Sequence, residues 1–293
     1  MPTISGTVYD ETGTAVAGRV VRAYRRDTGG LLGGTVSSDG SPTPGDSDFA
    51  NVSLLLHMEG DPTTDSSGTP KTMTLGSGTQ LVAEGARFGA QGLKSSPAGA
   101  TVPSHSDFAL PGDFTLECWF YAISFSPVYA SLFNIGQFSS GALFRVQPDK
   151  LELYINGNVY NAVTAVSSGA WHHAAWSRTG ATVSVFLDGV LAGTASDSGS
   201  IPAGGLTIGV SAHNSGEYLH GYLDEIRLTK GVGRYSSNFT PPALPFPDSA
   251  VGSATAVGSY SIPTTHAGEV NVVCLDDTAG TAYNDLILRT TPV

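Results

Sequence analysis

The chain has 293 residues, enough for one large all-β domain or for two domains. Only 13% of the residues are charged, and the content of 37 glycines and 17 prolines is typical of a protein with many short strands and few helices. The formal net charge is −11 and no run of Lys or Arg occurs, so we expect no nucleic-acid partner, because such a surface needs concentrated cations to displace counterions. No apolar run reaches the ~20 residues of a membrane helix, and the first residues lack the features of a secretory signal, so we expect neither a membrane partner nor export by the usual route.

The amino-terminal part of the chain predicts a three-stranded β meander. Residues 4–10, 19–27 and 31–40 alternate polar and apolar positions between turn signals. The segment Ser41–Asp48 is rich in Pro, Ser and Gly and lacks this alternation, which indicates a linker.

The strands that follow predict a two-sheet jelly roll that ends at a second linker, Pro241–Ala254. Their apolar residues recur at every second position, as in a half-buried sheet. The pairs Asn156-Gly157 and Asp188-Gly189 are typical of tight hairpin turns. The residues predicted to face the core are Phe114, Leu116, Cys118, Phe120, Leu151, Leu153, Ile155, Val183, Val185 and Leu187.

An acidic pair, Asp224 and Glu225, interrupts the last strand of this region, GYLDEIRLTK at 221–230. Strict alternation would place Asp224 on the face of Ile226 and Leu228, beside the core. A carboxylate buried there needs a cation or several hydrogen-bond donors, because leaving it unpaired costs several kcal/mol. We therefore expect a site at Asp224.

The carboxyl-terminal part predicts three more strands, at Gly258–Thr264, Glu269–Asp277 and Asn284–Pro292. Joining Val36–Gly40 to Gly258–Ile262 gives a strand, an Asp-Gly turn and a returning strand, which is a hairpin signal. We interpret the two chain ends as parts of one small sandwich, and the alternative is two or three domains in series. The two cysteines, Cys118 and Cys274, then fall in different domains and are expected to be buried and unpaired.

Several motifs resemble laminin-G-like (concanavalin A-like) jelly-roll domains, particularly those of tailed-phage virion proteins. The run GYLDEIRLTKGVGRYSSNFTPP resembles their closing strand and exit turn, and SLLLHMEG, DSSG, DFTLECWFY, WHHAAWSR and VSVFLDGVLAGT precede it in the expected order. The two ends together resemble small Ig-like or prealbumin-like sandwiches related to carboxypeptidase regulatory domains. These resemblances imply an all-β fold with a concanavalin A-like jelly-roll sandwich, residues 43–250, inserted into a small Ig-like β-sandwich made of residues 1–42 and 251–293.

The same resemblance implies a structural Ca²⁺ ion that ties the loop after the first strand to the last strand. Carboxylate and carbonyl oxygens are the ligands that calcium takes. The corresponding residues here are Asp65 and Asp224, with Asp61 and Glu59 behind them. The alternative is that Asp65 caps a turn and that Asp224 pairs with an Arg or with backbone N–H groups.

We expect no enzyme. Glycan hydrolases of this fold carry paired acids in a Glu-x-Asp-x-x-Glu-type run, and the sequence has none. His172 and His173 lie on a strand between Trp171 and Trp176, where one ring is expected to point inward and the other outward. The remaining histidines show no metal-ligand spacing, and no nucleophile elbow or phosphate loop occurs.

Carbohydrate binding is the alternative role that the loops indicate. A lectin site needs an exposed aromatic ring and polar groups that bind sugar hydroxyls. The loops 121–129 and 211–218 are candidates, and in the second of them His213, Asn214, Glu217 and Tyr218 would form the rim. Ordinary loop composition is the other interpretation.

From the sequence we therefore predict a non-enzymatic phage virion structural protein, a capsid or tail decoration or appendage that displays a lectin-like domain. The alternative is a carbohydrate-binding adhesion module that contacts the host surface. The expected partners are other virion proteins, further copies of the chain and a host-surface glycan. Assembly in the reducing cytoplasm of the bacterial host, followed by release in virions, agrees with the unpaired cysteines.

Overall fold

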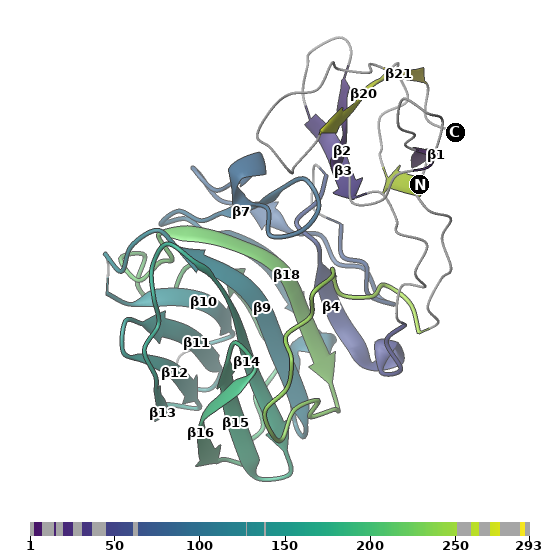
Figure 1. Ribbon diagram of the computed structural model, residues 1–293. Helices are drawn as coiled ribbons and strands as arrows, with labels where there is room; N and C mark the ends of the chain where they lie inside the picture. Colours follow the sequence, from purple (N-terminus) through teal and green to yellow (C-terminus); the bar gives the residue numbers. More distant parts are fainter. Residues whose placement is uncertain are drawn as a thin grey trace.

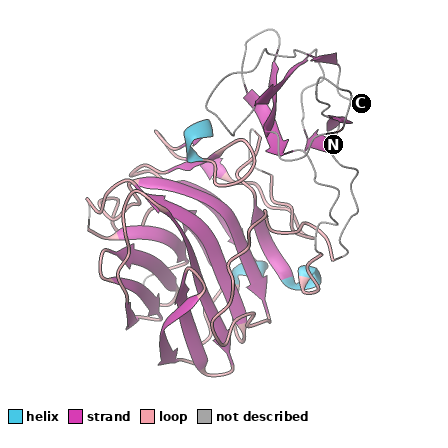
Figure 2. Ribbon diagram, viewed as in Figure 1, coloured by secondary structure: helices cyan, strands magenta, loops and turns pink. Residues whose placement is uncertain are grey.

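The computed structural model describes residues 3–7, 15, 20–25, 31–36, 45–60, 64–126, 128–137, 139–250, 259–263, 270–275 and 288–290. In these residues the fold is all-β, and two large antiparallel sheets face each other as a sandwich (Figures 1 and 2). Helix in the described ranges is limited to three single turns, η1 (Phe49–Asn51), η2 (Ala83–Gly85) and η3 (Ser106–Phe108). None of the helices in the described part is long and apolar enough to cross a membrane.

Each sheet of the sandwich follows a crossover order rather than the order of the chain. The seven-stranded sheet runs β13 (Asn158–Val163), β12 (Lys150–Ile155), β11 (Ala142–Gln147), β10 (Ala130–Ile135), β17 (Gly204–Ile208), β8 (Ala100–His105) and β5 (Thr74–Leu75). The eight-stranded sheet runs β16 (Val190–Ser196), β15 (Thr182–Leu187), β14 (Trp171–Thr179), β9 (Phe114–Ala122), β18 (Gly221–Lys230), β7 (Gly92–Lys94) and β6 (Gln80–Val82), and β4 (Val52–Leu56) pairs with β18. The predicted two-sheet architecture is confirmed.

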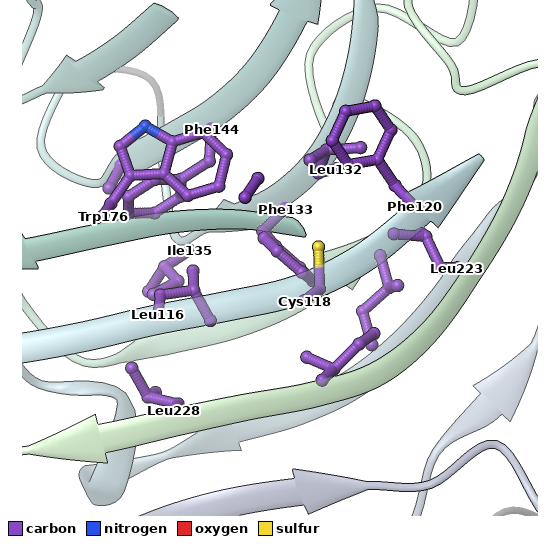
Figure 3. Close-up of a cluster of buried hydrophobic side chains, with 14 of the residues drawn as sticks. Leu116, Cys118, Phe120, Leu132, Phe133, Ile135, Phe144, Trp176, Leu223 and Leu228 are labelled. Carbon is purple, nitrogen blue, oxygen red and sulfur yellow. The ribbon is translucent and has the colours of Figure 1, made fainter. Parts of the chain in front are cut away.

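The core lies between the two sheets and contains the alternating apolar residues that the sequence predicts. Leu116 and Cys118 of β9 point toward Phe133 and Ile135 of β10, and Trp176 of β14 lies against Phe144 of β11 (Figure 3). All ten residues predicted to face the core belong to this buried cluster. Cys118 is a free, buried cysteine, and burial raises the pKa of its thiol well above the ordinary value.

Both predicted hairpin turns form. Asn156 and Gly157 have φ values of 49° and 83°, and Asp188 and Gly189 have φ values of 51° and 74°. These left-handed residues join β12 to β13 and β15 to β16 as antiparallel pairs. Positive φ at both central positions is the geometry that matches the right-handed twist of the strands.

The expectation that Asp224 shares the core face of β18 is wrong, because the strand contains a β-bulge. Glu225 adopts a φ of 49°, and the register with β9 shifts between Asp224 and Arg227. The bulge breaks the two-residue alternation, so Leu223 joins Ile226 in the core cluster instead of lying opposite to it. Asp224 therefore points away from the core, although it is fully buried.

The segment after β18 crosses the outer face of the eight-stranded sheet (Figure 1). Tyr235 stacks on Phe239 with 3.7 Å between ring centroids, and Phe239 packs against Phe186 of β15. His173 lies beneath this segment and is fully buried against Phe239, whereas His172 lies beside Phe120 of the core. The two histidines thus lie on opposite faces of β14, and both are buried.

The chain enters and leaves the sandwich at the same place. The backbone N–H of Asp46 donates to the carbonyl of Ser249 at 2.9 Å. The carboxylate of Asp46 binds the guanidinium groups of Arg227 at 3.0 Å and of Arg234 at 2.7 Å. These contacts fasten the segment before β4 to the last strand and to the segment that leaves it.

Strands from the two chain ends pair with each other (Figure 1). β1 (Thr3–Thr7) pairs with β19 (Ser259–Pro263), and a four-stranded sheet runs β21 (Leu288–Thr290), β20 (Val270–Leu275), β2 (Val20–Arg25) and β3 (Leu31–Val36). One detail of the prediction is wrong, because among the described strands β1 pairs with β19 rather than continuing a meander with β2. β19 lies near β3, but the Asp-Gly turn of the predicted hairpin, at residues 37–40, lies outside the described residues.

Candidate functional site

The outward face of the seven-stranded sheet carries a row of side chains that the sheet register aligns across four strands. Leu143 of β11 is paired with Asn134 of β10, which is paired with Thr207 of β17, and Thr207 is paired with Thr101 of β8. The sequence neighbours of these residues lie in the core, so alternation directs the row away from it. Tyr154 of β12 extends the row beyond Leu143.

A groove with a volume of about 350 Å³ lies over one end of this row. Its lining combines hydroxyl groups, a side-chain amide and glycine backbone with apolar residues, and no lining residue is charged. The lining residues are Thr101, Val102, Gly136, Gln137, Ser140, Pro202, Ala203, Gly204, Gly205, Leu206, Thr207 and Ala212.

Glycine is required where the hairpin after β10 approaches β17. A Cβ atom on Gly204 would lie 2.5 Å from the Cα atom of Gly136, closer than real Cβ contacts allow. Gly205 is different, because the nearest atom to a Cβ there is the Val102 carbonyl oxygen at 3.4 Å. The backbone thus forms part of the groove at close range, which leaves room for a ligand.

The loop 211–218, which the sequence singles out, folds against this face. The backbone N–H of Ala212 donates to Oδ1 of Asn134 at 3.3 Å, and Ala212 lines the groove. His213 and Asn214 are exposed, and Asn214 accepts a hydrogen bond from the Gly216 N–H at 3.0 Å. Tyr218 forms an isolated bridge with Val210 at the base of the loop. Of this loop, Ala212 lines the groove, and none of the four predicted rim residues is among the lining residues.

Glu217 turns toward a charged cluster farther along the same face. The guanidinium of Arg145 donates to Glu217 at 2.8 Å, to Glu152 at 2.5 Å and to the Tyr154 hydroxyl at 2.6 Å. The group also lies over the ring of Tyr129, 4.2 Å from its centroid, and 41% of Tyr129 remains exposed. This cluster joins both candidate loops to the sheet.

Every charge of the cluster is paired. Lys150 contacts the second carboxylate oxygen of Glu152 at 2.8 Å. Burial tends to raise the pKa of Glu152, but its bonds to Lys150 and Arg145 outweigh that effect and hold the pKa below the ordinary value. The two cations and the two carboxylates therefore neutralise one another.

The loop prediction identified Glu217 but missed the strand residues that bind it. Arg145, Glu152 and Tyr154 lie on β11 and β12, and alternation in LELYI already places Glu152 and Tyr154 opposite the core leucines. That signal was available in the sequence. The pairing of Arg145 with Glu217 was not, because it depends on how a loop 72 residues away folds back.

The three predicted calcium ligands among the described residues, Glu59, Asp65 and Asp224, form no metal-holding group of three. Oδ1 of Asp65 accepts hydrogen bonds from the N–H groups of Leu55 and Ser67, and Oδ2 accepts from that of Lys71, all at 2.9 Å. The Lys71 ammonium also lies 3.7 Å from Asp65. These donors leave Asp65 with the role of a turn cap, which was the alternative interpretation.

Asp224 and Glu59 lie together near the loop 87–91. Oδ2 of Asp224 accepts from the N–H groups of Arg87 and Phe88 at 2.7 and 3.0 Å. Oε1 of Glu59 accepts hydrogen bonds from the backbone N–H groups of Ala90 and Gln91. The buried Oε2 of Glu59 has no hydrogen-bond partner among the described residues. Burial raises the pKa of Glu59 to about 8 despite those two hydrogen bonds.

The remaining residue of the predicted set, Asp61, lies outside the described residues. Within the described part of the chain, no group of three or more His, Cys, Asp or Glu side chains is arranged to hold a metal ion. Any ion at Glu59 and Asp224 would therefore need backbone carbonyls or water for most of its ligands.

Comparison with known proteins agrees with this architecture. Residues 94–232 match the family Laminin_G_3, described as the concanavalin A-like lectin/glucanases superfamily. No curated protein sequence matches the chain.

Similar solved structures are bacterial toxin binding domains. The binding domain of Paraclostridial Mosquitocidal Protein 1 has 15% identity and a TM-score of 0.51, over 62% of this chain and 49% of that one. The binding domain of botulinum neurotoxin serotype D has 11% identity and a TM-score of 0.52, over 67% of this chain and 50% of that one. This chain therefore spans about half the length of those structures, and the likeness concerns the fold. The protein contains a concanavalin A-like domain built from two antiparallel sheets.

Proposed function

We propose that this protein binds carbohydrate on the outward face of its seven-stranded sheet. The observation that carries the proposal is the uncharged groove over Thr101 and Thr207, bordered by the loop 211–218. Threonine hydroxyls, a glutamine amide and backbone groups both donate and accept hydrogen bonds, as sugar hydroxyls do. Tyr129 adds an exposed aromatic ring on the same face.

A sugar complex exists for a solved structure that shares this fold over half of its length. The botulinum neurotoxin serotype D ligand binding domain, 10% identical to the present chain with a TM-score of 0.51 and matched over 50% of its own length, was solved in complex with N-acetylneuraminic acid. Work on botulinum neurotoxin type C, 11% identical with a TM-score of 0.50, describes an interaction with two ganglioside molecules. At these identities the likeness supports a binding role in general and no particular sugar.

Binding of the full chain to a glycan array tests this function. We expect Asn214→Ala and Tyr218→Ala to weaken binding, because they alter the loop that borders the groove. The purified protein should release no reducing sugar from the bound glycan, since we propose binding without hydrolysis. An array with no bound glycan would overturn the proposal, and release of reducing sugar would overturn its non-enzymatic part.

We further propose that the chain is a virion structural protein of a tailed phage, whose two ends form an Ig-like base that displays the concanavalin A-like domain. Pairing of β1 with β19 and of β2 with β20 supports a base made from both ends. The hydrogen bond from Asp46 to Ser249 supports an inserted domain, because an insertion needs neighbouring termini. Other virion proteins and further copies of the chain would be its partners.

Particle analysis separates this structural role from host attachment. A virion component co-purifies with particles at a fixed ratio to the capsid protein, and imaging of the particle locates it. A host-adhesion role also requires that Asn214→Ala and Tyr218→Ala reduce attachment of particles to the host. Absence of the chain from purified particles would contradict the virion proposal and leave carbohydrate binding untouched.

We also propose a structural calcium ion at Glu59 and Asp224. The buried Oε2 of Glu59 supports this, since a cation would compensate a carboxylate oxygen that has no hydrogen-bond partner among the described residues. The ion would neutralise the carboxylates and hold the loop 87–91 on β18.

A further inference from the structure

The charge pattern of the outward face points to the class of glycan. We infer that the groove selects neutral glycans over sialylated, sulfated or uronic-acid glycans, an inference that depends on the proposed carbohydrate-binding function. Three independent features carry it.

The first feature is the lining of the groove itself. An anionic sugar is recognised by Arg or Lys side chains or by converging N–H groups that compensate its charge. The groove offers no Arg or Lys side chain, and its polar side chains are those of Thr101, Gln137, Ser140 and Thr207. Hydroxyl and amide groups match neutral sugar hydroxyls in both donor and acceptor capacity.

The second feature is the state of the nearby cations. Arg145 uses its three nitrogens on Glu152, Glu217 and Tyr154, and aromatic rings lie near its guanidinium plane. An anionic sugar that recruited Arg145 would have to displace one of the carboxylates. Glu152 is only 4% exposed, so displacement would leave a buried carboxylate partly unpaired, which is strongly unfavourable. Arg145 therefore orders the face and is not available to a ligand.

The third feature is the negative net charge of the whole chain. The formal net charge of −11 repels polyanionic chains over distances of about 8 Å at physiological salt and farther at lower salt. Approach of an acidic polysaccharide is therefore disfavoured even before contact. The repulsion acts in the same direction as the uncharged groove and the paired cations.

The size of the groove limits what it holds. Its volume of about 350 Å³ is at the lower end of the range of about 300–1,000 Å³ that ligand pockets occupy. The groove thus recognises a short part of a glycan.

The test uses the full chain on an array that pairs neutral oligosaccharides of glucose, galactose, mannose and N-acetylglucosamine with sialylated, sulfated and uronic-acid counterparts. We expect neutral glycans to bind at least tenfold more tightly than their acidic counterparts, and the ratio to grow as salt is lowered. Preference for acidic glycans would overturn this inference while leaving carbohydrate binding intact. An array with no bound glycan would overturn both.

Two groove variants locate the site. Gly205→Val adds volume to the lining at a position where a Cβ atom has ordinary contacts, and Thr207→Val removes one hydroxyl at nearly constant volume. We expect the first to reduce neutral-glycan binding at least tenfold and the second a few-fold. Gly112→Val is the matched control, because a Cβ on Gly112 meets nothing within 4 Å and Gly112 does not line the groove. Neutral binding that survives both groove variants in folded protein would overturn the assignment to the groove.

A gain-of-function variant tests the role of the paired cations. Glu217→Gln removes one of the two carboxylates on Arg145 and leaves Glu152 in place. We expect a several-fold gain in the binding of acidic glycans relative to neutral ones. A loss of neutral binding without any gain for acidic glycans would contradict the role given to Arg145.

Discussion

The buried carboxylate of Glu117 makes the free energy of unfolding of the two-sheet sandwich depend on pH. Glu117 is fully buried beneath the segment that follows β18, where Arg227 donates to Oε1 and the Tyr235 hydroxyl donates to Oε2. Burial would raise its pKa, but Arg227 and His173 lower it to about 2, below the ordinary 4.5. A lowered carboxylate pKa stabilises the fold above the unfolded-state value and loses this contribution as the pH falls.

We therefore expect the free energy of unfolding to fall by about 3 kcal/mol between pH 4.5 and pH 2 on account of Glu117. Glu117→Gln should be less stable by several kcal/mol at pH 7, because it leaves Arg227 with one buried carboxylate fewer. The difference from the natural protein should shrink toward pH 2. Urea unfolding at a series of pH values measures this, and a difference independent of pH would contradict the account.

The calcium proposal is also tested at single residues. At a calcium concentration one hundred times Kd, the ion would add about 2.7 kcal/mol to the free energy of unfolding. We expect Glu59→Gln to abolish this gain and Asp65→Asn to retain it, because the Asp65 oxygens already accept backbone N–H donors. An unchanged Tm on chelation of the natural protein would refute the site.

At the scale of elements, the hairpins were predictable and the bulge was not. Asn-Gly and Asp-Gly between alternating strands specify a turn whose backbone conformation few other residues adopt. Glu225 has no such signature, since a left-handed Glu is unfavourable by itself. The Glu225 carboxylate offsets this cost by accepting hydrogen bonds from the His57 ring and from the Phe246 N–H. These partners lie 168 and 21 residues away in the sequence. Periodicity alone therefore placed Asp224 on the wrong face.

The turn between β12 and β13 gives a direct test of this reasoning. Gly157 has a φ of 83°, and a Cβ atom there would meet nothing within 4 Å, so any cost of substitution is conformational. We expect Gly157→Ala to lower the free energy of unfolding by about 1–2 kcal/mol. Gly112→Ala, which also meets nothing but does not have a positive φ, should change it by less than about 0.5 kcal/mol. Equal effects in urea unfolding would contradict the turn assignment.

At the scale of the whole molecule, Asp46 joins the segment through which the chain enters the concanavalin A-like domain to the last strand and to the segment that leaves it. Asp46 is 6% exposed and binds Arg227 and Arg234, and these guanidinium groups lower its pKa even though burial opposes the shift. Asp46→Asn should cost about 3–5 kcal/mol of unfolding free energy, as removal of one partner from a buried ion pair does. Asp48→Asn is the control, because the Asp48 carboxylate is 39% exposed and lies 3.8 Å from Arg234. A cost for Asp46→Asn no larger than for Asp48→Asn would show that other contacts hold the segment before β4 on β18.

The central claim is that the outward face of the seven-stranded sheet is a carbohydrate site. A crystal structure of the full chain with the tightest neutral oligosaccharide from the array measures this most directly. We predict sugar density in the groove, with hydroxyls within hydrogen-bond distance of Thr101 and Thr207. Sugar bound on any other face, with the groove left open, would contradict the claim.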